Sequence, residues 1–148
     1  SLLSNGHVWL LNPSGVLFGA NSSVNVQSLL ATTRAISDAD FLTNKLHFAG
    51  GGAGQVSNAG VIAVGEGGYV VLSAQSVENI GSIQAQLGQV HLASGKAFVI
   101  DLNGDKLLRF DVTQALSSSD ATESLVKNTG NILADGGRVQ MTARAANG

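Results

Sequence analysis

The chain has 148 residues, of which 12% are charged and 44% are hydrophobic, and its formal net charge at pH 7 is −2. Its apolar content argues against disorder, its scattered Lys and Arg residues against nucleic-acid binding, and the absence of any apolar run of about 18 residues against membrane insertion. The absence of cysteine excludes disulfides, and 19 glycines with a single proline fit many short strands joined by tight turns.

The first predicted element is a β-turn near the N-terminus. Asn12-Pro13-Ser14-Gly15 has the residue types that a type I turn prefers, with Asn first, Pro second and Gly fourth. Turn chemistry accounts for each residue of the segment, so its first interpretation is structural. Recognition by a partner is a second interpretation, and a rigid turn is compatible with both.

The segment at about 35–48 departs from the strand pattern that surrounds it. It contains Ser37-Asp38-Ala39-Asp40, a favourable helix start with Asp40 near the positive end of the helix dipole. Helix-start chemistry explains Asp38 and Asp40 better than a catalytic pair of carboxylates does. We expect this segment to decorate the flank of the main fold.

An internal repeat covers much of the remaining chain. Residues 77–94 and 126–143 share, without a gap, the pattern V-x-N-x-G-x-I-x-A-x-x-G-x-V-x-[LM], and a third copy begins at Val56. Asn58 recurs as Asn79 after 21 residues and as Asn128 after a further 49. We interpret the longer spacing as about two units plus an excursion.

Each unit consists of short strands with sharp corners. Ile83 with Ala85, and Val90 with Leu92, are period-2 pairs that place apolar side chains on one face, and glycines separate the pairs. A single unit cannot bury that face, whereas stacked units can. Leucine-rich and propeller repeats lack support here, and a β-sandwich would not need a 21-residue echo.

The predicted fold is therefore all-β, a right-handed parallel β-helix over residues 1–148 with short extra-helical decorations at about 35–48 and 96–125. Stacked units would bring matching side chains to one corner, where amides can form a hydrogen-bonded ladder. The residues of this structural ladder are Asn58, Asn79 and Asn128.

Residues 96–125 interrupt the repeat. The stretch FVIDLNGDKLLRFDV predicts a hairpin with Asn103-Gly104 at its turn. Oxygen-bearing residues alternate from Asp101 to Asp105 as in a calcium loop, but the glycine is misplaced for an EF-hand and no distal Glu follows. The hairpin is therefore the favoured interpretation.

The histidines show no metal-ligand spacing, because His7, His47 and His91 are 40 and 44 residues apart. His91 lies between Val90 and Leu92, which places it on the outward face of its strand, in a structural or solvated role. No metal, cofactor or catalytic residue is predicted.

The segment Asn5 to Ala20, NGHVWLLNPSGVLFGA, resembles the haemagglutination-activity region of two-partner-secretion exoproteins of the filamentous-haemagglutinin type. That family also includes haemolysins and contact-dependent toxins, and its pattern is roughly N-G-x-V-x-L-x-N-P-N-G-[IV]-x-F-G. Ser14 departs from the pattern where the family usually has Asn. The repeats are similar to the family's N-x-G-x-I and G-G-x-V-x-L rungs, so the resemblance runs across nearly the whole chain.

This resemblance implies a secretion and folding module of a large adhesin or haemagglutinin-like exoprotein, and not an enzyme. Family members are recognised in the periplasm by a partner outer-membrane transporter, cross the membrane unfolded, and coil into a β-helix at the surface of a Gram-negative cell or beyond it. The family's NPNGI motif falls on the candidate recognition residues Asn12, Pro13, Ser14, Gly15 and Val16.

Receptors on host or bacterial cells would bind through the rest of the parent protein. Two other functions stay open at this point. One is a carbohydrate-active β-helix enzyme, which the fold alone suggests. The other is an inert structural shaft of an adhesin.

Overall fold

The computed structural model describes residues 1–36, 45–49, 54–95, 97–102, 108–114 and 126–143. All the regular structure in these ranges is β-strand. The same ranges hold no helix that is long and apolar enough to cross a membrane.

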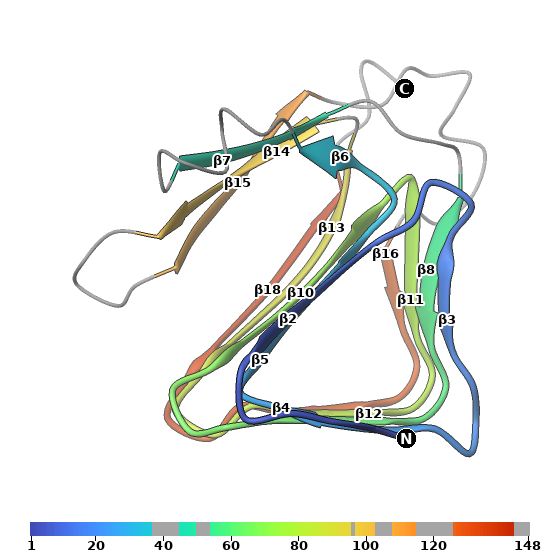
Figure 1. Ribbon diagram of the computed structural model, residues 1–148, viewed down its shortest axis with the longest axis vertical. Helices are drawn as coiled ribbons and strands as arrows, with labels where there is room; N and C mark the ends of the chain where they lie inside the picture. Colours follow the sequence, from blue (N-terminus) through green and yellow to red (C-terminus); the bar gives the residue numbers. More distant parts are fainter. Residues whose placement is uncertain (37–44, 50–53, 96, 103–107, 115–125, 144–148) are drawn as a thin grey trace.

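Three parallel sheets form the walls of a triangular coil (Figure 1). The chain passes through the three walls in turn and then begins the next coil. In Figure 1 it runs clockwise while receding from the viewer, so the coil is right-handed. The predicted right-handed parallel β-helix is confirmed.

We name the walls sheets A, B and C. Sheet A contains β1 (Leu2–Leu3), β4 (Ser23–Val26), β9 (Val61–Val64), β12 (Ser82–Gln84) and β17 (Asn131–Leu133). Sheet B contains β2 (His7–Leu11), β5 (Ser28–Thr32), β10 (Tyr69–Ala74), β13 (Gln89–Ser94) and β18 (Arg138–Ala143). Sheet C contains β3 (Val16–Phe18), β8 (Gln55–Asn58), β11 (Ser76–Asn79) and β16 (Val126–Asn128). Coils 1 to 5 begin at β1, β4, β9, β12 and β17 respectively.

The sequence repeat is the register of the coils. Val77 pairs with Val126 on the next coil and with Val56 on the previous one. The predicted alignment is confirmed, but the interpretation of the 49-residue spacing is wrong. Asn79 pairs directly with Asn128, so one coil and not two separates them. The residues between β13 and β16 leave the coil and return in register, which lengthens the spacing without adding a coil.

The main core fills the interior of the coil. Alternate residues of each strand point inward and stack in columns, one residue from each coil. Ile62 and Ile83 are neighbours in one column and are fully buried, as are Leu72 and Leu92 in another. Each side chain of this kind stabilises the fold by roughly 1.5–3 kcal/mol relative to exposure.

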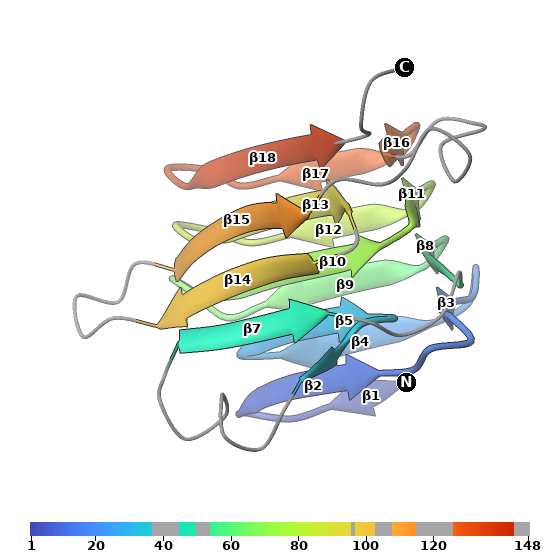
Figure 2. The same cartoon turned by 90° about the horizontal axis from the view of Figure 1, so that it is seen from above.

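A fourth sheet, sheet D, lies against the outer face of sheet B (Figures 1 and 2). Its antiparallel strands are β6 (Ala35–Ile36), β7 (Lys45–Ala49), β14 (Ala97–Leu102) and β15 (Leu108–Gln114). A second buried cluster joins the two sheets and consists of Leu30, Phe48, Val71, Ala93 and Phe98.

The two segments predicted as decorations contribute the strands of sheet D. Residues 45–49, which were expected to follow a helix start, are a strand. The predicted helix start at Ser37 to Asp40 lies outside the described residues. The predicted hairpin turn at Asn103-Gly104 also lies outside them, although the strands on either side of it, β14 and β15, pair as a hairpin would.

Candidate functional site

The candidate recognition residues form the corner between β2 and β3 on coil 1. The backbone N–H of Gly15 donates to the carbonyl of Asn12 at 3.0 Å, which closes a β-turn. Asn12 Oδ1 accepts a second hydrogen bond, from the N–H of Ser14 at 3.0 Å. The side chain of Asn12 thus supports its own turn, as Asn commonly does. Asn12, Pro13 and Ser14 are exposed.

Two glycines let this corner sit directly on coil 2. Gly15 has a φ of +119°, which side chains rarely tolerate, and a Cβ there would lie 2.8 Å from the carbonyl oxygen of Gln55. A Cβ on Gly54 would lie 2.6 Å from the nitrogen of Gly15. The N–H of Asn12 donates to Thr32 of coil 2 at 3.0 Å. Val16 continues the corner into the core, where it pairs with Val56.

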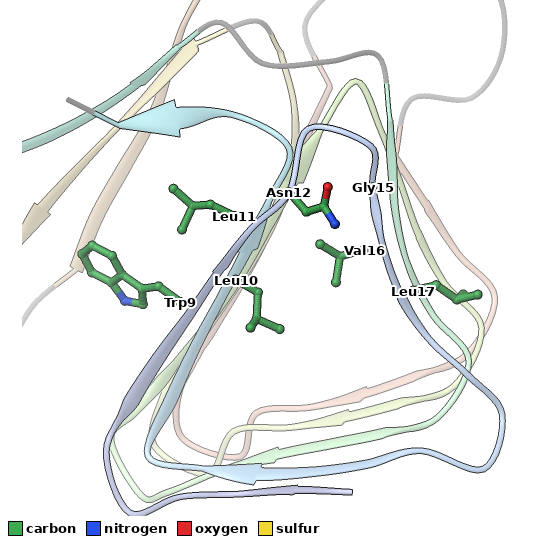
Figure 3. A pocket seen from close by; sticks show the side chains of 7 residues that line it. All are labelled: Trp9, Leu10, Leu11, Asn12, Gly15, Val16 and Leu17. Carbon is green, nitrogen blue, oxygen red and sulfur yellow. The ribbon is translucent and has the colours of Figure 1, made fainter. Parts of the chain in front are cut away.

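A hollow of about 520 Å³ opens beside the corner at the end of coil 1. Figure 3 shows Leu10 and Val16 pointing into the interior of the coil, whereas Trp9, Leu11 and Leu17 point outward. Leu17 is 74% exposed. The hollow is apolar on its inner side and meets the exposed polar atoms of Asn12 at its rim.

The corner and the hollow carry no charge. Arg34 is the first residue of the sequence with a charged side chain, and His7 is the one histidine that precedes it. Within the described ranges, no hydrogen bond uses Asn12 Nδ2. A partner that recognises this region must therefore rely on hydrogen bonds and apolar contacts, and not on charge.

The three asparagines of the repeat lie in one column of sheet C, in the interior of the coil. Asn58 Nδ2 donates to Asn79 Oδ1 at 2.9 Å, and Asn79 Nδ2 donates to Asn128 Oδ1 at 2.8 Å. Asn58 and Asn79 are fully buried, and Asn128 is exposed on the last coil described in sheet C. On coil 1 the same position holds Phe18. The ladder satisfies amide groups that would otherwise be costly inside the coil.

His91 faces outward from sheet B, as its place in the sequence predicts. It is only 2% exposed, however, and its Nε2 lies 2.9 Å from Gln89 Oε1. Burial, and then the nearby charge of Arg138, lower the pKa of His91 to about 4. The sequence did not reveal this burial, because the sheet that covers the outer face comes from distant segments.

An aromatic group near the corner also escaped the sequence analysis. Trp9 Nε1 donates to the Tyr69 hydroxyl at 2.9 Å, although the two residues are two coils apart. The ring of Trp9 meets Phe48 edge-on, with centroids 6.2 Å apart, and His7 stacks on Tyr69 at 5.6 Å. The sequence signal that could have revealed this group is the presence of outward-facing aromatic residues on strands of the same wall.

Among the described residues, no group of three or more His, Asp or Glu side chains could hold a metal ion. In the described part of the chain, burial raises the pKa of Tyr69 and lowers the pKa of His91. Neither lies beside a carboxylate in a cleft. The features that stand out are the corner at Asn12–Val16, the hollow beside it and the asparagine ladder.

Comparison with known proteins supplies a family. A family model described as the TPS secretion domain matches residues 2–148. The chain is 33% identical, over 159 aligned residues, to the heme/hemopexin-binding protein of Haemophilus influenzae, in an alignment that covers 99% of the chain. The crystal structure of the HMW1 secretion domain from Haemophilus influenzae matches 96% of the chain with a TM-score of 0.77 and 24% identity, which shows a shared fold. The chain spans 16% of the former protein and 40% of the latter.

Proposed function

This chain belongs to the family of TPS secretion domains, the modules of two-partner-secretion exoproteins, and from this premise we propose that the corner at Asn12–Val16 is read by a partner outer-membrane transporter. Exoproteins of this family pass through the periplasm to the surface of a Gram-negative cell or to its surroundings. The domain is a secretion module of such an exoprotein.

The local character of the turn supports this proposal. Both hydrogen bonds of the turn join residues two or three positions apart in the sequence. Pro13 fixes its own φ and restricts Asn12 to extended conformations. The turn can therefore form in a chain that has not yet coiled, whereas the asparagine ladder needs stacked coils. A transporter that binds its cargo before folding needs a signal of this local kind.

The surroundings of the turn support the same proposal. Asn12, Pro13 and Ser14 are exposed, and the hollow beside them combines apolar side chains with polar atoms in similar measure. No charged residue lies within the first 33 positions. An uncharged segment of this kind presents amide and hydroxyl groups together with apolar side chains, which suits recognition by shape and hydrogen bonding.

Export of the parent exoprotein tests the proposal. In cells that carry the transporter, Asn12→Ala should lower the amount of exported protein about tenfold, which corresponds to one or two lost hydrogen bonds. Asn21→Ala is the matched control, because Asn21 is also an exposed asparagine at a corner of coil 1 and should leave export unchanged. Equal export of the two variants would remove the recognition role from Asn12.

The purpose of the whole exoprotein belongs to the proposal as well. We assign adhesion, or another haemagglutinin-like activity towards host or bacterial cells, to the parent protein outside this domain. The domain itself acts in secretion and folding and not as an enzyme, in line with a family of secretion domains.

A further inference from the structure

The two segments that build sheet D leave the coil at the same corner. On coil 2 the N–H of Thr33 donates to the carbonyl of Ser73 at 3.3 Å, and on coil 4 the N–H of Gly95 donates to the carbonyl of Ala74 at 3.4 Å. Both exits therefore border coil 3. Coil 3 itself turns this corner with a single residue, Gln75, between β10 and β11.

Arg34 ties the two exits together across coil 3. Its Nε and Nη2 both donate to the carbonyl oxygen of Gly95, at 3.1 and 2.8 Å. The side chain is buried, with only 6% of the residue exposed. Burial of a guanidinium is costly unless its donors are satisfied, so the arrangement is favourable only when Gly95 is in place.

Sheet D rests on a floor that three coils supply. Leu30 of β5 and Val71 of β10 pair at one outward position, and Ala93 occupies the next outward position on β13. Each of the three is at most 1% exposed. The rings of Phe48 and Phe98 belong to the same buried cluster and stack on each other with centroids 4.6 Å apart. This floor exists only after coils 2, 3 and 4 have stacked. Sheet D therefore needs the coil before it can bury its aromatic rings.

Sequence separation points to the same order. Arg34 and Gly95 are 61 residues apart, whereas Asn58 and Asn79, which join successive coils, are 21 apart. Closing a longer loop costs more conformational entropy before its contacts form. Six strands, β8 to β13, lie between β7 and its partner β14 in the sequence, so β14 is made or exported later than β7.

We propose that sheet D and the Arg34–Gly95 contact form a clasp that closes last and joins coils 2 to 4 into one cooperative unit. While the clasp is open, the apolar outer face of sheet B, including Trp9, Leu30 and Val71, is uncovered. The clasp is independent of the recognition of Asn12–Val16, so either idea can fail without the other.

Folding kinetics of the full chain test the order of events. Phe98→Leu truncates the clasp, and Ile83→Val is the control inside the coil, where Ile83 is fully buried. If the clasp closes after the rate-limiting step, Phe98→Leu should speed unfolding about tenfold and change the folding rate less than about twofold. Ile83→Val should instead slow folding. If Phe98→Leu instead lowers the folding rate by the same factor as the equilibrium constant for folding, the proposal is overturned.

Native-state hydrogen exchange of the unaltered chain provides a second test, which does not depend on whether Phe98→Leu folds. The backbone amides of β7 and β14 should exchange through an opening that leaves β10 and β13 protected. Exchange of all four strands through one common opening would contradict a clasp that closes last.

Discussion

Asn58 and Asn79 hold the same buried position on successive coils, and the amide of Asn58 donates to Oδ1 of Asn79 at 2.9 Å. Asn79 Nδ2 in turn donates to Oδ1 of Asn128 at 2.8 Å. Each asparagine thus satisfies part of its neighbour's hydrogen-bonding capacity, and the central one, Asn79, bonds to the coils on both sides. This arrangement makes the three positions unequal in their effect on stability.

Asn79→Ala should lower the free energy of unfolding by about 2–4 kcal/mol, because it removes both ladder hydrogen bonds and a longer one to the Asn131 carbonyl, and it leaves the buried amide of Asn58 short of an acceptor. Asn128→Ala should cost less than about 1 kcal/mol, because Asn128 is exposed and makes one ladder contact. Urea unfolding followed by circular dichroism measures both. Equal losses would show that the ladder does not act as a chain of buried bonds.

Leu87 marks a strained corner. Its φ is +52°, and the matching corner residues on the neighbouring coils, Gly67 and Gly136, have φ values of +74° and +72°. Leu87→Gly should therefore raise the free energy of unfolding by up to about 1 kcal/mol, the relief of a left-handed side chain less the entropy that glycine adds. Leu133→Gly is the control, since Leu87 and Leu133 are both 53% exposed but Leu133 lies in strand β17. Leu133→Gly should lower the free energy of unfolding. If Leu87→Gly lowers it by the same amount, the backbone at Leu87 is not strained.

His91 gives the stability a defined pH dependence. Above pH 6.5 the imidazole is neutral in both the folded and the unfolded chain. Between pH 6.5 and about 4 the unfolded chain takes up a proton that the folded chain does not, so the free energy of unfolding falls as the pH falls. Below the folded pKa no further loss arises from this group.

The loss due to His91 should amount to about 3 kcal/mol between pH 7 and pH 4. The measurement is the difference between the stability curves of the unaltered chain and His91→Gln, in which contributions from other groups cancel. The unaltered chain should lose more stability on acidification than the variant. Parallel curves would show that His91 is not held neutral in the folded chain.

Gly54→Ala separates folded from unfolded recognition. The added Cβ would lie 2.6 Å from the nitrogen of Gly15 and would push the corner off coil 2, so the folded chain should lose about 1–3 kcal/mol of stability. Binding of the unfolded chain to the transporter should not change, because Gly54 lies far from Asn12 in the sequence. Weaker binding by unfolded Gly54→Ala would show that the partner reads more than the local turn.

The coil itself was readable from the sequence. Period-2 apolar pairs and glycine corners fixed the register, and Val77 pairs with Val56 and Val126 as the repeat aligns them. The number of coils between Asn79 and Asn128 was not readable, because an excursion of any length can return to the same register. A repeat of side chains records stacking but not the length of chain outside the stack.

The outer layer was beyond the sequence for a related reason. His91 and Arg34 look like surface residues in the sequence, yet both are buried. His91 lies on the wall that sheet D covers, and Arg34 binds the carbonyl of Gly95, which is 61 residues away. Local patterns describe which way a side chain points, whereas burial depends on what arrives above it. The turn at Asn12–Gly15 was predictable because its contacts are local.

The most direct test of the central claim is a binding titration of the chain, unfolded and folded, with the periplasmic domains of its transporter, in the unaltered form and as Asn12→Ala and Asn21→Ala. The account predicts that the unfolded chain binds, that Asn12→Ala weakens binding about tenfold, and that Asn21→Ala leaves it unchanged. Equal binding by all three unfolded chains, or none at all, would contradict a secretion signal at Asn12–Val16.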